Sequence, residues 1–110
     1  MPKRSPRLLL EDILTAIDKI ERYVRGLDEP GFLDDDKTVD AVVRNLEIIG
    51  EASRQLPEAY RDAHADIPWH NMAGLRNRIV HDYIGIDLQM LWHIIQNEIP
   101  PLKSNIQSLL

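Results

Sequence analysis

The chain has 110 residues and a formal net charge of −5, with 44% apolar and 28% charged residues. These values are ordinary for a globular protein, and the length favours a single domain over residues 1–110. The lack of cysteine excludes disulfides and thiolate chemistry. No apolar run approaches the roughly 20 residues of a membrane span. The acidic balance argues against broad, non-specific binding to nucleic acid.

The first predicted element is a long helix. Ser5 followed by Pro6 is typical of a helix start, with serine as the N-cap and proline at the first helical position. Apolar residues then recur at spacings of three and four, so we expect helix to about Gly26. Two acids follow soon after the basic segment 1–7 and interrupt any signal-type apolar core. We therefore expect a cytoplasmic protein.

A turn at Asp28–Gly31 separates this helix from a second one. The three consecutive acids at 34–36 invite a metal interpretation, but acids before a helix more often cap its free N–H groups and complement its dipole. Gly50 inside the second helix costs roughly 1 kcal/mol relative to alanine, which predicts a close helix crossing. Glu47 and Glu51 share a face, either as solvent-facing carboxylates, the commoner case, or as an acid–base pair.

A short third helix is expected over residues 57–63. Pro68 then opens a fourth helix that carries residues 76–81 and ends near residues 83–85, where glycine is a typical C-cap. In this prediction His81 lies near a helix C-terminus, whose partial negative charge favours imidazolium, while the neighbouring arginines oppose it.

A fifth helix is expected after Asp87, its N-cap, and Pro100 and Pro101 are expected to end it. A short closing helix or docked tail follows, and no segment is predicted to be a strand. The pattern therefore predicts an all-α fold, an up-and-down bundle of four to five helices with short connections.

The residues that carry chemistry are concentrated in the segment Leu75–Tyr83, with the sequence LRNRIVHDY. Arginine is permanently cationic and its planar fork of donors matches phosphate oxygens, and histidine exchanges protons near neutral pH. RNA cleavage needs a base for the ribose 2′-OH, cations for the phosphorane and an acid for the leaving 5′-oxygen. Because the nucleophile belongs to the substrate, no metal is formally required. No acid occurs between Ile67 and His81, so the segment is locally basic.

The spacing within this segment bears on its geometry. On a helix, Asn77 and Arg78 lie four and three residues before His81 and share its face. Arg76 lies five residues before His81, roughly 140° around an ideal helix. Arg76 and His81 therefore meet only if the helix loosens near His81, if the arginine wraps back, or if a second copy of the chain supplies one of them.

The arrangement Arg76-x4-His81-x-Tyr83 resembles the motif of the HepT toxins, which belong to the HEPN ribonuclease superfamily. The surrounding sequence is also similar to that family, at Asn45–Ala52 and at Gly74–Asn77, and the likeness runs from about residue 8 to about residue 100. The resemblance implies a HEPN-like helical homodimer that acts as a metal-independent RNA endonuclease, the toxin half of a toxin–antitoxin pair.

The resemblance also implies roles for individual residues. Arg76 and His81 would be catalytic, with Asn77, Arg78 and Glu51 in supporting positions. No metal or other cofactor is expected. The partner would be an MntA-like nucleotidyltransferase antitoxin that transfers AMP to the motif tyrosine, here Tyr83, and so blocks RNA.

Two other interpretations are kept. In the first, the chain is a non-catalytic helical dimer that binds and completes the nucleotidyltransferase. In the second, Arg76 and its neighbours only make hydrogen bonds at a dimer interface. The sequence leaves open which RNA is cut, the chemistry of the product ends and the stoichiometry with the partner.

Overall fold

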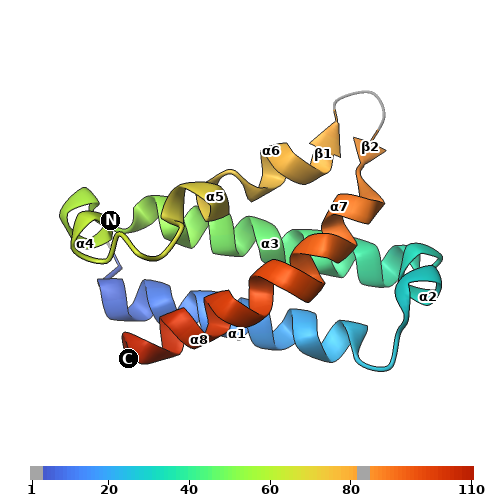
Figure 1. Ribbon diagram of the computed structural model, residues 1–110, viewed down its shortest axis with the longest axis horizontal. Helices are drawn as coiled ribbons and strands as arrows, with labels where there is room; N and C mark the ends of the chain where they lie inside the picture. The colour runs from blue at the N-terminus through green and yellow to red at the C-terminus, as the bar shows by residue number, and fades with distance from the viewer. Residues whose placement is uncertain (1–3, 82–84) are drawn as a thin grey trace.

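The computed structural model describes residues 4–81 and 85–110, without the side chain of His81. The fold is all-α, as expected (Figure 1). The elements are α1 (Pro6–Val24), α2 (Glu29–Leu33), α3 (Asp36–Gln55), α4 (Glu58–Ala63), α5 (Trp69–Ala73), α6 (Leu75–Ile79), β1 (Val80–His81), β2 (Gly85–Ile86), α7 (Leu88–His93), the π-helical turn η1 (Ile94–Glu98) and α8 (Ile99–Ser108). No helix in the described ranges is long and apolar enough to cross a membrane.

The two long helices α1 and α3 lie antiparallel and form the frame of the molecule (Figure 1). Both begin at the predicted caps. Ser5 Oγ accepts a hydrogen bond from the backbone N–H of Leu8 at 3.2 Å, and Asp35 Oδ1 accepts one from Thr38 at 3.1 Å. The three acids at 34–36 therefore include the cap of α3, as the sequence interpretation favoured, because the cap satisfies N–H groups that have no partner inside the helix.

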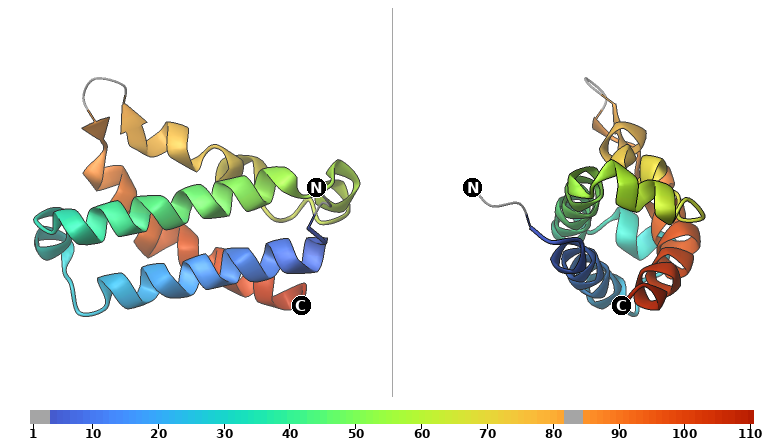
Figure 2. Two further views of the ribbon diagram at one scale, coloured as in Figure 1. Left: turned by 180° about the vertical axis from the view of Figure 1, so that it is seen from behind. Right: turned by 90° about the vertical axis from the view of Figure 1, so that its left-hand side faces the viewer.

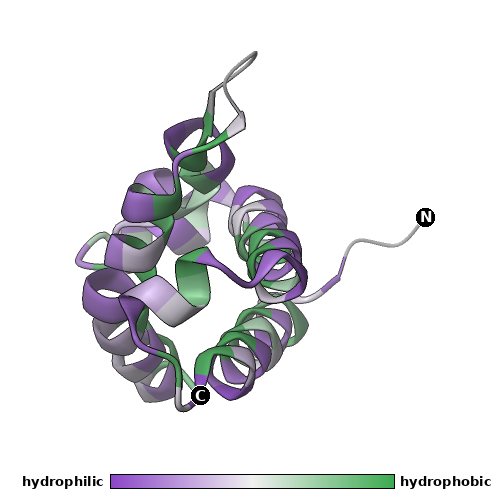
Figure 3. Ribbon diagram, turned by 90° about the vertical axis from the view of Figure 1, so that its right-hand side faces the viewer, coloured by the Kyte–Doolittle hydropathy of each residue, from purple (hydrophilic) through white to green (hydrophobic). Residues whose placement is uncertain are grey.

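The core lies between this frame and the C-terminal segment formed by α7, η1 and α8, as the end-on view in Figure 2 shows. Apolar and polar residues alternate around each helix (Figure 3), and the apolar ones fill the interior. Ile17, Leu46, Ile49 and Ile94 are all 0% exposed. Burying such a side chain stabilises the fold by roughly 1.5–3 kcal/mol. The shared apolar core therefore holds α1, α3 and the C-terminal segment together.

The predicted turn at Asp28–Gly31 is instead the start of the short helix α2. Asp28 Oδ1 caps it by accepting a hydrogen bond from Gly31 N at 2.9 Å, and Pro30 occupies its first turn. The helix forms because it buries Phe32 completely, with the ring of Trp92 on α7 at a centroid distance of 5.2 Å. The burial of Phe32 in the core thus stabilises helix in a segment whose local sequence is typical of a turn.

Gly50 lies where α3 crosses α5, which confirms the predicted close helix crossing. A Cβ at this position would lie 3.0 Å from the carbonyl oxygen of Met72 and 3.6 Å from that of Ala73. Only a residue without a side chain lets the two backbones approach this closely.

The predicted fourth helix is wrong in its length. It is divided at Gly74 into α5 and α6, and helix ends at Ile79 rather than near residue 83. Val80 and His81 are extended and pair antiparallel with Ile86 and Gly85. Two β-branched residues in succession disfavour helix, and Asp87 N closes the turn by donating to the Ile79 carbonyl at 2.6 Å. The expectation of no strand is therefore also wrong.

The predicted helix end at Pro100 and Pro101 is wrong as well. α7, η1 and α8 follow one another without a break, and the prolines lie in the first turn of α8. A proline ring clashes with the carbonyl four residues earlier and removes an N–H donor. The wider π-helical turn Ile94–Glu98 ends two residues before Pro100 and accommodates both effects. Asp87 caps α7 as predicted, accepting from Met90 N at 3.0 Å.

Candidate active site

Arg76 lies in the first turn of α6 and projects over α3. Its side chain is 68% exposed, and its Nε lies 4.0 Å from a carboxylate oxygen of Glu47. This distance is at the limit of an ion pair, and an exposed pair of this kind is worth about 0–1 kcal/mol. The guanidinium is therefore held loosely and remains available to an anionic ligand.

Beside Arg76 a groove of about 460 Å³ runs along α3, and we call it the α3 groove. Its polar lining includes Arg44, Glu47, Glu51 and Arg54 from α3 together with Arg76. Arg4 belongs to the lining as well, so four arginines face one open groove. Arg4 is paired with Asp12 and Arg54 with Glu51, whereas Arg44 and Arg76 present donors suited to phosphate oxygens.

Arg54, which sequence reasoning did not select, connects α3 to the end of α5. Its Nη1 donates to the Ala73 carbonyl at 2.6 Å, and its Nη2 donates to Glu51 at 2.7 Å. The hydrogen bonds from Arg54 and then Gln55 hold the pKa of the Glu51 carboxyl below its usual range. Glu51 is thus an ionised partner of Arg54 at neutral pH, which fits a supporting residue better than a proton acceptor.

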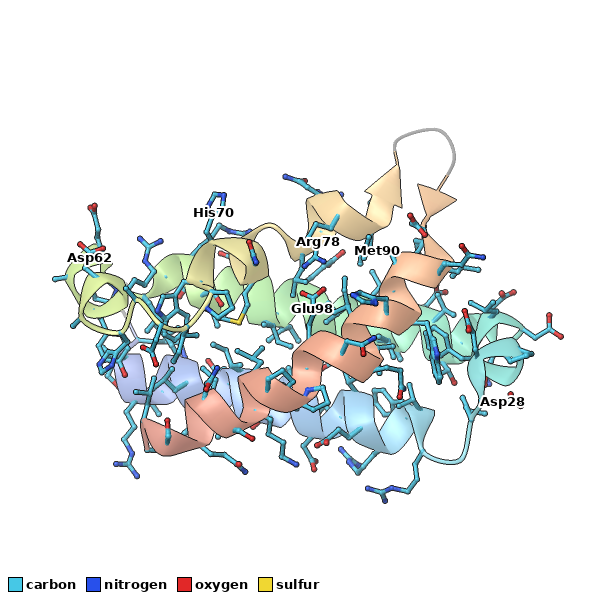
Figure 4. The ribbon with its side chains drawn as sticks, in the orientation of Figure 1. Asp28, Asp62, His70, Arg78, Met90 and Glu98 are labelled. Carbon is cyan, nitrogen blue, oxygen red and sulfur yellow. The ribbon has the colours of Figure 1, made fainter. Side chains whose placement is uncertain are left out.

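Arg78, two residues after Arg76, has a different environment. Its two terminal nitrogens donate to the two carboxylate oxygens of Glu98 at 2.7 and 2.6 Å, and the sulfur of Met90 lies 3.8 Å away (Figure 4). These hydrogen bonds raise the pKa of Arg78 and lower the pKa of Glu98, while the partial burial of both groups opposes each shift. Glu98 was not singled out from the sequence, since no local pattern connects two residues 20 positions apart.

The remaining residues of the motif are described only in part. Asn77 is exposed on α6. The backbone of His81 lies in β1, two residues beyond the end of α6, where it pairs with Gly85. The sequence had suggested that His81 lies near the C-terminus of a helix. It lies instead in a strand, beyond the end of α6. Its side chain, and the whole of Tyr83, lie outside the described residues.

Metal-ligating side chains are scattered in this structure. Across residues 4–81 and 85–110, no group of three or more histidine, aspartate or glutamate side chains is arranged to hold a metal ion. The groups that converge near the motif are arginines and their carboxylate partners, a set that suits an anion.

An all-α domain that presents Arg76 beside an open groove, in a segment that also contains a second arginine and a histidine, combines residue types that suit a helical nuclease. Comparison with known proteins identifies the family: residues 13–109 match the model described as "Ribonuclease HepT-like". The chain belongs to the HepT-like ribonuclease family, and it is thus an enzyme of the ribonuclease class. This confirms the resemblance found in the motif.

Several curated relatives match over nearly their whole length. The "Probable ribonuclease HepT" of Thermococcus cleftensis is 44% identical over 107 residues, 97% of each chain. A protein of Caldanaerobacter subterraneus named as an RNase is 36% identical, over 97% of this chain and 96% of its own. Another so named, from Methanocaldococcus jannaschii, is 37% identical over 100% of this chain and 91% of its own. No solved structure gives a significant match.

Proposed function

We propose that this chain is a metal-independent RNA endonuclease that acts as the toxin of a toxin–antitoxin pair, with Arg76 and His81 as its catalytic residues. The observation that carries the proposal is the contrast between the two arginines of α6. Arg78 is held in a two-point ion pair, whereas Arg76 is exposed beside the α3 groove with a single carboxylate at 4.0 Å. Of these two arginines, Arg76 is the cation that is free to meet a phosphodiester.

The proposed reaction uses the substrate's own nucleophile. A base removes the proton from the ribose 2′-OH, the 2′-oxygen attacks phosphorus, and the bond from phosphorus to the 5′-oxygen breaks. The leaving oxygen takes a proton from an acid, so the expected products carry a 2′,3′-cyclic phosphate and a 5′-OH. His81 serves as base or acid, and Arg76 stabilises the charge that develops on the phosphorane oxygens. Asn77 orients the site.

A homodimer completes the proposal. Arg76 and His81 are separated by the end of α6, and a second chain offers a second copy of each residue with which a site can be completed. The two motifs would then face each other across a cleft that receives one RNA strand. The α3 groove, with Arg44 along it, offers a further contact to a phosphate beside the cut.

The test of catalysis is cleavage of a defined RNA by purified protein in the presence of a metal chelator. We expect Arg76→Ala and His81→Ala each to lower kcat/KM at least about 100-fold, because each removes a group that acts in the transition state. Arg22→Ala is the matched control, since Arg22 is an exposed arginine on α1 that is paired with Asp18. Full activity in either motif variant would disprove the assigned roles.

The proposed antidote is transfer of AMP from ATP to Tyr83 by a nucleotidyltransferase. The phenol oxygen attacks the α-phosphorus, pyrophosphate leaves, and the phenol proton is lost. The added phosphodiester is a bulky anion two residues from His81, and it repels RNA by like charge. Incubation with the partner and ATP, followed by intact-mass measurement, is expected to show added AMP in the wild type and none in Tyr83→Phe.

The alternative is a non-catalytic helical dimer that completes the nucleotidyltransferase. The exposed Arg76 favours it as well, because an ATP phosphate is also an anion. Growth after induced expression without the partner separates the two proposals. Arrest by the wild type but not by His81→Ala supports the nuclease, whereas equal growth of both supports the binding module.

A further inference from the structure

The two arginines of α6 point to opposite sides of the helix. Positions two residues apart are separated by about 200° around a helix axis. Arg76 therefore projects over α3, where Glu47 lies, and Arg78 projects toward the C-terminal segment, where Glu98 lies. Figure 4 shows the Arg78 and Glu98 side chains facing each other between α6 and that segment.

The contact between Arg78 and Glu98 has the geometry of a strong ion pair. Both donors of the guanidinium fork are engaged, at 2.7 and 2.6 Å, and the two side chains are only 31% and 33% exposed. A two-point contact fixes orientation as well as distance, which a single hydrogen bond does not. Because α6 is only five residues long, this contact restrains the whole helix.

Glu98 comes from an unusual element. It is the last residue of the π-helical turn η1, which separates α7 from the two prolines of α8. π-Helical turns are rare and recur at functional sites, where the additional residue changes which side chains face a neighbouring element. His93, one turn earlier, places its Nε2 3.8 Å from the same carboxylate and adds a second polar contact to it.

We propose that Glu98 is a positioning residue for the ribonuclease reaction: through its two-point contact with Arg78 it orients α6, and thereby sets where Arg76 and the strand that carries His81 stand relative to the scissile phosphate. This inference rests on the proposed function. In it Arg78 is not a ligand of RNA, because its donors and its charge are already taken up by Glu98. In this proposal Arg76 binds the substrate phosphate, and Arg78 fixes the orientation of α6.

The first experiment compares Glu98→Gln with a matched control. Glu21→Gln removes a carboxylate of similar exposure, 39%, whose Oε1 pairs with Lys103 at 2.8 Å and connects α1 to α8 away from the motif. We expect Glu98→Gln to lower kcat about tenfold with KM within about twofold, since misorientation weakens contacts made in the transition state. Glu21→Gln is expected to keep both within about twofold of the wild type.

A second set of variants tests whether Glu98 acts through Arg78. Arg78→Gln is expected to lower kcat as much as Glu98→Gln, and the double variant no further, because both remove one contact. The exchanged pair, Arg78→Glu with Glu98→Arg, restores opposite charges across the same gap. It is expected to recover kcat to within about threefold of the wild type.

These outcomes separate the inference from the function on which it rests. If Arg76→Ala abolishes cleavage but Glu98→Gln equals Glu21→Gln in kcat, the positioning role is wrong and the proposed function stands. If Arg76→Ala keeps full activity, the proposed site itself is wrong. A folded exchanged pair that stays as inactive as the single variants also overturns the inference, since one of the two side chains then acts on RNA directly.

Discussion

At the scale of single residues, Gly50 is the position where the backbones of α3 and α5 pass close to each other. A Cβ added to Gly50 would lie 3.0 Å from the carbonyl oxygen of Met72. This oxygen belongs to the backbone, so it cannot turn away as the end of a side chain can. Alanine would gain helix propensity at position 50 but would force α3 and α5 apart.

We therefore expect Gly50→Ala to lower the free energy of unfolding by about 1 kcal/mol, the difference between the strain of overpacking and the gain in propensity. Urea denaturation measures it. Gly74→Ala is the control, because its Cβ would lie 3.5 Å from the nearest carbonyl, an ordinary contact, and it should change stability by less than about 0.5 kcal/mol. If Gly50→Ala were more stable than the wild type, the crossing of α3 and α5 would have room for a methyl group, and the predicted strain would be wrong.

The pH dependence of stability provides a test of Glu98. Hydrogen bonds from Arg78 hold the pKa of Glu98 below its ordinary value of 4.5 in the folded protein. The folded state therefore binds this proton less readily than the unfolded state does. The stabilisation from the pair is complete above pH 4.5 and is lost as the pH falls through the folded pKa.

We expect the wild type to exceed Glu98→Gln in unfolding free energy by about 1 kcal/mol at pH 7, with a constant difference down to about pH 5.5 and convergence of the two proteins in more acidic solution. Denaturation series at stepped pH measure the difference. In the Arg78→Gln background the difference should be small at every pH, and a pH-dependent gap there would assign the effect to another partner.

At the scale of elements, the end of α6 decides where His81 stands. Helix gives way to an antiparallel pair in which Val80 faces Ile86 and His81 faces Gly85. Gly85 has a φ of +94°, a conformation that side chains with a Cβ adopt only with strain. The return of the chain from β1 into β2 and α7 depends on this glycine.

Gly85→Ala is expected to lower the unfolding free energy by about 1 kcal/mol and also to lower RNA cleavage severalfold, because the strain falls on the strand that pairs with His81. Gly26 is a matched control: it has a φ of +82°, lies just after α1, and is far along the chain from the motif. Gly26→Ala should lose similar stability and keep its cleavage rate. Equal cleavage by both variants would separate the hairpin from catalysis.

At the scale of the whole molecule, the number of chains in the active enzyme remains a prediction. Arg76 and His81 are separated by the end of α6, and two chains offer the alternative in which each site takes one residue from each chain. Mixing of two inactive variants distinguishes sites within one chain from sites shared between chains.

If the sites are shared, co-refolded Arg76→Ala and His81→Ala should recover about a quarter of the wild-type activity, because about half of the dimers are mixed and each mixed dimer has one intact site of two. Each variant alone should stay inactive. Sedimentation over a range of concentrations checks that dimers form. No recovery in a mixture shown to contain mixed dimers would place both residues of each site in one chain.

What the sequence determined by itself was the set of interactions that act over one or two helical turns. Apolar residues at spacings of three and four, with the caps Ser5, Asp35 and Asp87, predicted the principal helices and the all-α class, because helix periodicity and capping are local. The motif from Arg76 to Tyr83 predicted the family that the comparison confirmed.

Only the tertiary structure decided the features that depend on distant partners. The buried Phe32 made α2 a helix, and the pairing of Val80 with Ile86 ended α6 early. The π-helical turn allowed the C-terminal helical segment to continue through Pro100 and Pro101. Glu98 contacts Arg78, which lies 20 residues earlier in the sequence. Such contacts form because separate segments share one core, so their free energy depends on packing that no short stretch of sequence encodes.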